Sequence, residues 1–128
     1  WNNCGMSRNS VDLKSAIKGI QKLKKQFYSD LLIPGDQFSF NEPLAKALRV
    51  ADFMELGELF ALDALKRNES CGGHFREEFQ TKEGEAMRND KEFTFVSAWE
   101  YNKVIENSTL HKEKLLFDNV ELKNRSYK

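Results

Sequence analysis

The stretch RVADFMELGELFALDALKRNESCGGHFREEF, residues 49–79, contains the change of pattern that decides the fold. Its first half shows a broad arc of apolar residues at helical spacing. Its second half, from Asn68 to Phe79, gathers a thiol, a Gly-Gly pair, an imidazole, an arginine and carboxylates. Because glycine adopts left-handed backbone angles without penalty, we expect Gly72 and Gly73 to terminate the helix.

This helix is predicted to cover residues 41–68. Asn41 is a suitable N-cap, and Pro43 fits the first turn, where its missing N–H costs little. A helix that is apolar on several sides is either central in its domain or has a neighbour outside the chain. Apolar residues outside the main arc stand at Leu48, Leu56 and Leu59.

An earlier helix is predicted over residues 9–32. Asn9 or Ser10 can cap its start, and Pro34-Gly35 stops it. Steps of three and four place one apolar face along it, formed by Leu13, Ile17, Ile20, Leu23, Phe27 and Leu31.

The period changes to two further along the chain. In FTFVSAWEY, residues 93–101, Phe95 and Trp99 share one face while Val96 and Glu100 share the other, which predicts a strand. A second, less regular strand is predicted in KLLFDNVEL, residues 114–122, after a long polar connection. The expected fold is mainly α: a helical bundle followed by a small C-terminal β-hairpin over about residues 93–122.

The totals exclude several classes of function. The 128 residues suffice for one domain, and twenty basic residues balance twenty acidic ones, so charge gives no reason to expect a nucleic acid partner. No apolar run approaches the roughly 20 residues that span a bilayer, so we expect no direct membrane insertion. Two cysteines, Cys4 and Cys71, fit a reducing compartment. The start WNNCG lacks an initiator methionine, and we expect a piece of a longer protein.

No set of residues makes a complete catalytic, cofactor or metal site. Cys71 and His74 have a spacing that zinc sites use, but Cys4 and His111 would have to complete the four ligands from distant positions. The same pair is a poor candidate for nucleophilic catalysis, since such pairs come from separate elements. No glycine-rich phosphate loop is present. A metal-binding module through Cys71 and His74 remains an open alternative.

The segment NESCGGHFREEF and its flanks, RVADFMELGELFALDALKR and RNDKEFTFVSAWEYN, resemble the C-terminal region of succinate dehydrogenase and fumarate reductase flavoprotein subunits, in their Bacteroides-type version. The two ends of the chain also resemble family patterns: a Gly-x-x-Arg pattern at Gly5 and Arg8, and an Arg-x-Tyr pattern at Arg125 and Tyr127. Cys71 departs from the family, which often has arginine there. The family motif maps onto Glu69, Ser70, Gly72, His74 and Arg76, for which we expect structural and interface roles.

The resemblance implies a parent enzyme that interconverts succinate and fumarate by hydride transfer at FAD. It implies a three-helix, spectrin-repeat-like bundle, residues 1–128, packed on the FAD domain beside a capping domain of the same polypeptide. An iron–sulfur subunit and a membrane anchor subunit would hold the parent on the cytoplasmic side of the inner membrane, peripherally. No catalytic, cofactor-binding or metal residue is carried over, and the isolated chain is expected to be inactive. The alternative is a free-standing helical protein-interaction module.

Overall fold

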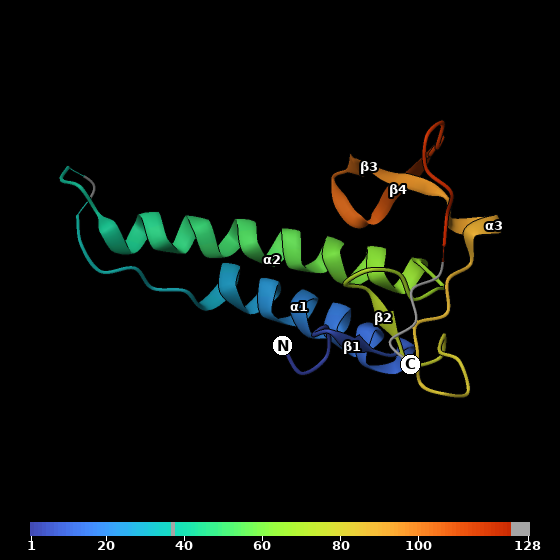
Figure 1. The fold of residues 1–128 in the computed structure, drawn as a ribbon. Coiled ribbons are helices and arrows are strands. Elements are labelled where there is room, and N and C mark those ends of the chain that lie inside the picture. The colour runs from blue at the N-terminus through green and yellow to red at the C-terminus, as the bar shows by residue number, and fades with distance from the viewer. Residues whose placement is uncertain (37, 124–128) are drawn as a thin grey trace.

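The computed structural model describes residues 1–36 and 38–123 of the chain. Two long antiparallel helices lie side by side, and a hairpin of two strands lies over the last part of the second helix (Figure 1). A helical bundle followed by a small antiparallel hairpin is thus confirmed, although the third described helix is a single turn. The elements are β1 (Ser7–Arg8), α1 (Ser10–Asp30), α2 (Glu42–Lys66), β2 (Phe75–Arg76), α3 (Asp90–Phe93), β3 (Phe95–Asn102) and β4 (Val104–Lys114).

Both long helices begin at side-chain caps. The Oδ1 atom of Asn9 accepts a hydrogen bond from the backbone N–H of Asp12 at 2.9 Å. The Oδ1 atom of Asn41 accepts one from the N–H of Leu44 at 3.0 Å. Each cap satisfies a donor that the first helical turn leaves unpaired, which is why the sequence located these two starts to within one residue.

The core between the helices lies near the start of α1 and the end of α2. Leu13 is 0% exposed, and it packs against Ala61 and Ala64, which are 1% and 4% exposed. The two alanines bring the backbone of α2 close to Leu13. Partly buried side chains complete this cluster: Cys4, Ala16, Ile17 and Leu65.

Much of the apolar arc predicted for α2 lies on the surface of the described chain. Phe53 and Phe60, which belong to the arc, are 66% and 51% exposed, so of the two alternatives a central position within the described chain does not account for them. Leu48 and Leu56 are also exposed, while Leu59 is half-buried. A second layer of protein on this face would bury these side chains favourably.

Gly57, in the middle of α2, is a site where alanine is expected to stabilise the chain. A Cβ atom there would meet Cδ1 of Ile20 at 3.7 Å, which is an ordinary contact. Alanine restricts the unfolded chain and has the higher helix propensity, so Gly57→Ala should raise the free energy of unfolding by about 0.5–1 kcal/mol. Urea denaturation measures this difference. Gly72→Ala is the matched control and should destabilise, because Gly72 has φ 58°.

The hairpin packs one face of β3 toward the helices. Phe95 is buried and Trp99 half-buried, whereas Val96 and Glu100 are exposed, which confirms the alternation read from the sequence. The indole Nε1–H of Trp99 donates to Oδ1 of Asp63 on α2 at 2.8 Å. This bond fixes the hairpin on the second helix.

The predicted second strand over residues 114–122 is wrong. The chain turns at Lys103, with φ 65°, and returns at once as β4, which pairs antiparallel with β3 from Phe95↔Lys114 to Asn102↔Val104. The residues that were predicted to be a polar connection therefore form the second strand of the hairpin. Its outer face is solvated, so apolar alternation is weak, and only Ile105 is buried among the residues of β4.

Gly72 and Gly73 do not terminate α2, contrary to expectation. The helix ends at Lys66 with its C-cap at Arg67. The glycines instead occupy a tight turn, across which Cys71 and His74 exchange backbone hydrogen bonds of 2.8 and 3.0 Å. Positive φ at Gly72 is what this turn requires.

Candidate functional site

The residues predicted from the motif meet where α2 ends, beside the short parallel pairing of β1 with β2. Ser70 is 0% exposed and holds the turn closed. Its hydroxyl accepts a hydrogen bond from the N–H of Arg76 at 2.8 Å and donates one to the carbonyl of Arg76 at 3.2 Å. The backbone N–H of Ser70 reaches the carbonyl of Met87 at 2.9 Å. A buried hydroxyl thus has all its partners within the protein, as burial demands.

Glu69, at 2% exposure, joins the end of α2 to the segment before the hairpin. Its Oε1 accepts from Nη1 of Arg67 at 2.6 Å, and its Oε2 accepts from the backbone N–H of Asn89 at 2.9 Å. Arg67 continues the connection, since it also donates to the carbonyls of Phe93 and Phe95 at 3.2 and 2.9 Å. Each oxygen of the buried carboxylate thus has a donor within the domain.

Arg76, at 2% exposure, caps the end of α2 with its guanidinium. Its Nη1 donates to the carbonyl oxygens of Ala64 and Leu65 at 2.9 and 3.3 Å. Its Nε donates to Oε2 of Glu78 at 3.1 Å. A cation is favourable at this end of a helix, where the macrodipole is negative and the last carbonyls lack partners.

His74 contacts Arg8 on one side and the helix end on the other. Its Nδ1 lies 3.0 Å from Nη1 of Arg8, and its Nε2 lies 3.0 Å from the carbonyl oxygen of Arg67. A guanidinium can only donate and a carbonyl can only accept, so Nδ1 accepts and Nε2 carries the proton. The ring is therefore neutral. Burial, together with the charges of Arg8, Arg76 and Arg67, lowers the pKa of His74 against the opposing hydrogen bond to the Arg67 carbonyl.

Glu78 brings the same segment to the start of α1. Its Oε1 accepts from the backbone N–H of Ser10 at 2.5 Å, which favours the negative charge at the positive end of the helix. Burial raises the pKa of Glu78, but hydrogen bonds from Arg76 and Ser10 outweigh it and bring the pKa to about 2. Arg76 and Glu78 thus tie the end of α2 to the beginning of α1.

The lowered pKa of His74 predicts loss of stability in mild acid. The unfolded chain binds a proton at His74 near pH 6.5, whereas the folded chain resists it, so stability is full above pH about 6.5 and falls below it. The slope cannot exceed about 1.4 kcal/mol per pH unit for one proton. Free energies of unfolding at pH 7.5 and 5.5 measure it. His74→Gln should flatten the profile.

Arg8 and Arg67 were not predicted to bridge the elements, although both are essential to the geometry. A signal for Arg67 is in the sequence: arginine followed two residues later by an acid. This spacing recurs in the ion pairs Arg67–Glu69, Arg76–Glu78 and Arg88–Asp90. Arg8 has Ser10 at that position, so its contact with His74 could be found only from the fold.

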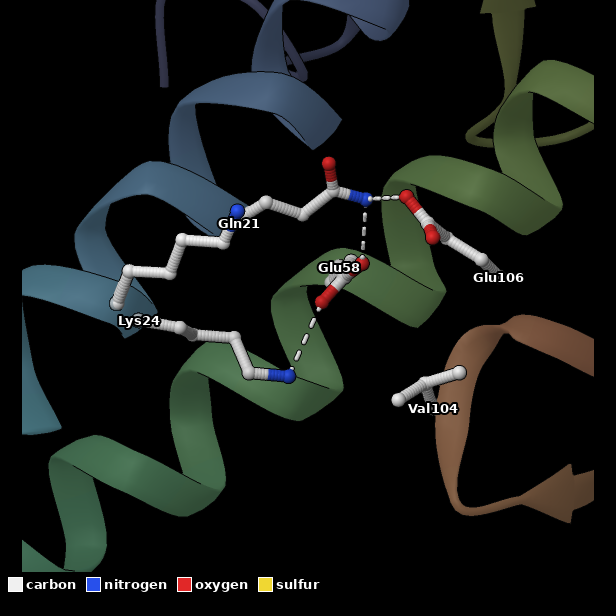
Figure 2. A pocket seen from close by; sticks show the side chains of 6 residues that line it. Gln21, Lys24, Glu58, Val104 and Glu106 are labelled. Carbon is white, nitrogen blue, oxygen red and sulfur yellow. Dashed lines mark hydrogen bonds and ion pairs between the residues drawn. The ribbon is translucent and has the colours of Figure 1, made fainter.

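A second polar cluster lies under the hairpin, away from the motif (Figure 2). The side-chain amide of Gln21 on α1 donates to Glu58 on α2 at 3.0 Å and to Glu106 on β4 at 2.6 Å. Glu58 is 3% exposed and also accepts from Nζ of Lys24 at 3.2 Å. The cluster joins three elements, and its buried carboxylate has two donors.

Neither cluster has the composition of a reaction centre. An open cavity of about 370 Å³ beside the motif is lined by Arg8, Phe60 and His74, with Cys71 at its wall. His74 is engaged through both ring nitrogens, so it is not placed to activate the Cys71 thiol. Within residues 1–36 and 38–123, no group of three or more His, Cys, Asp or Glu side chains could hold a metal ion.

Comparisons with known proteins agree with this architecture. The family model described as fumarate reductase flavoprotein C-term matches residues 1–127. Among solved structures, a variant of the FrdA subunit of quinol fumarate reductase from E. coli matches with a TM-score of 0.76 and 21% identity, over 93% of this chain and 19% of that chain. A search of curated proteins found no match. From the match along nearly its whole length, the chain belongs to the fumarate reductase flavoprotein C-terminal family.

Proposed function

We propose that the chain is the non-catalytic C-terminal domain of a flavoprotein that interconverts succinate and fumarate by hydride transfer at FAD. The observation that carries the proposal is the family match over residues 1–127, together with the small share, 19%, that the chain covers of the FrdA subunit. The flavin and the reacting dicarboxylate would then be held by the remainder of the parent polypeptide, its FAD and capping domains.

We expect no FAD ligand among the described residues. The starts of the long helices, which are natural phosphate sites, are occupied by Asn9, Glu78 and Asn41 of the chain itself. Gly72 and Gly73 lie in a turn that the backbones of Cys71 and His74 close, so they do not form a phosphate loop. We therefore derive no catalytic step through FAD from this chain, and we expect the isolated chain to be inactive.

The proposed role is to support assembly of the parent enzyme. This role is supported by the polar groups of the motif, which join β2 to the end of α2 and to the segment before the hairpin. The exposed apolar side of α2, with Phe53, Leu56 and Phe60, is available to the FAD domain.

The proposal extends to the wider complex. An iron–sulfur subunit would accept electrons from the flavin, and a membrane anchor subunit would hold the complex peripherally at the cytoplasmic side of the inner membrane. Within the described part of the chain, no helix combines the length and the hydropathy that a membrane crossing needs.

Flavin content separates this function from a free-standing interaction module. The purified chain should show no flavin absorbance and no fumarate reduction, whereas the full-length parent should show both. An in-frame flavin-binding region upstream in the coding sequence supports the proposal. A start codon directly before the codon for Trp1 supports the interaction module. Stoichiometric flavin binding by residues 1–128 alone would contradict the proposal.

His74→Ala in the full-length enzyme should lower flavin content or assembly more than substrate affinity. The substitution removes the acceptor of Arg8 and the donor to the Arg67 carbonyl, and both contacts lie within this domain. Flavin absorbance per protein and the Michaelis constant for fumarate are the two measurements. His111→Ala, at an exposed contact with Glu100 in the hairpin, is the matched control and should change neither. Unchanged flavin content with a large rise in the Michaelis constant is the contrary result.

A further inference from the structure

Among the arginines of residues 1–36 and 38–123, Arg8 is the half-buried one without an ion pair. Arg67, Arg76 and Arg88 each pair with a carboxylate two residues further along the chain. Arg49 is exposed to solvent on α2. In the described ranges 1–36 and 38–123, no carboxylate lies within ion-pair distance of Arg8. Holding a cation partly out of water without an opposite charge is costly, so this arrangement requires an explanation.

The contacts of Arg8 fix its orientation without using all its donors. Nε donates to the carbonyl of Gly5 at 2.6 Å, and Nη1 donates to Nδ1 of His74 at 3.0 Å. The guanidinium carbon lies 4.9 Å from the centre of the Phe60 ring, a cation–π distance. A guanidinium has five N–H donors, so donors remain for a further acceptor. The neutral ring of His74 positions the fork without cancelling its charge.

The cavity in front of Arg8 suits an acidic side chain. Its volume is about 370 Å³, and Arg8 and Arg67 both line it, with Asp63 as the one carboxylate in its lining. Asp63 accepts a hydrogen bond from the neutral indole of Trp99 and forms no ion pair with Arg8. The wall on one side is Phe60, which is 51% exposed and offers an apolar surface to whatever covers the cavity. A planar guanidinium fork binds a carboxylate through two parallel hydrogen bonds.

We propose that the Arg8 cavity receives an aspartate or glutamate side chain from the flavin-binding part of the same polypeptide. Charge complementarity selects this occupant, and the exposed Phe60 ring at the rim indicates that a protein surface covers the cavity. The inference rests on the proposed function, which supplies the covering domain. It adds that one interdomain ion pair, centred on Arg8, aligns the two parts.

Zero-length carbodiimide cross-linking of full-length Arg8→Lys tests this pairing. The introduced amine keeps the charge, and the reagent couples an amine to a carboxylate only when the two are in contact. Peptide mapping should find a cross-link from position 8 to an Asp or Glu outside residues 1–128, at least tenfold above wild type. Arg88→Lys is the matched control and should couple to Asp90, its partner at 2.5 Å.

Coupling only within residues 1–128, or none at position 8 while the control couples, overturns the inference. The second outcome is also the result expected if the cavity binds a small free anion in place of a carboxylate side chain. Phe60→Lys, at an exposed position of the same cavity, gives a second route to the same carboxylate if the first variant fails to fold. The flavin absorbance of the wild-type full-length parent is a separate reading. A flavin-free parent refutes the proposed function, whereas a flavin-loaded parent without the cross-link refutes only the Arg8 pairing.

Discussion

Replacing Arg76 with methionine should destabilise the domain by about 3–5 kcal/mol, the range for removing one partner of a buried charge network. Methionine fills part of the same volume but donates no hydrogen bond. The carbonyls of Ala64 and Leu65 would lose a charged donor, and Glu78 would lose its guanidinium partner while still facing α1. Because the side chain is 2% exposed, water cannot replace these bonds without opening the junction.

Urea denaturation of the two proteins measures this loss. Arg76→Lys should fall between them, because it keeps a charge near the helix end but not the planar fork. Lys46→Met is the control, since Lys46 and its partner Glu42 are exposed, and such pairs contribute about 0.3–0.5 kcal/mol. A loss under about 1 kcal/mol for Arg76→Met would mean that the helix end does not depend on this cap.

The helices were predictable because their starts depend on local chemistry. Asn9 and Asn41 cap through bonds that span only three residues, so a single sequence contains both partners. The predicted end of α2 was less accurate, because the residue at which this helix ends depends on groups distant in the sequence. Arg76 caps it from the far side of the Gly72–Gly73 turn, and the glycines that looked like a helix stop are needed for that return.

The hairpin shows the same division between local and distant causes. Alternation along β3 could be read directly because one of its faces is packed on the helices. β4 could not be read in this way, since its stability comes from pairing with β3 and its outer face is polar. The turn at Lys103 lacks the Asn-Gly or Asp-Gly signal that usually identifies a tight hairpin.

The motif was recognised in the sequence as a set of residues but not as a set of contacts. Ser70 and Arg76 bind each other across the turn, whereas Glu69 and His74 bind residues outside the motif. One of these outside residues, Arg8, precedes His74 by 66 positions. Pairings at that separation follow from the packing of β1 beside β2, and no local pattern predicts them.

Leu13→Ala should cost about 3–5 kcal/mol, the upper part of the range for truncating a buried leucine. The cost depends on how well neighbours can fill the cavity, and the two buried neighbours are unsuited to filling it. Ala61 and Ala64 carry only a methyl group, which cannot extend toward the gap, and each is held on the backbone of α2. The void would therefore persist between the helices.

Thermal and urea unfolding of Leu13→Ala and of Leu13→Met separate the cost of the cavity from the cost of replacing the leucine itself. Methionine conserves volume and should cost under about 1.5 kcal/mol. Leu32→Ala, at a side chain that is 91% exposed, should stay within about 0.5 kcal/mol of wild type. Because α1 begins beside Glu78 and Arg8, a gap at Leu13 should also loosen the junction that the motif builds. Equal losses for the alanine and methionine variants would show that shape, and not the cavity, determines the cost.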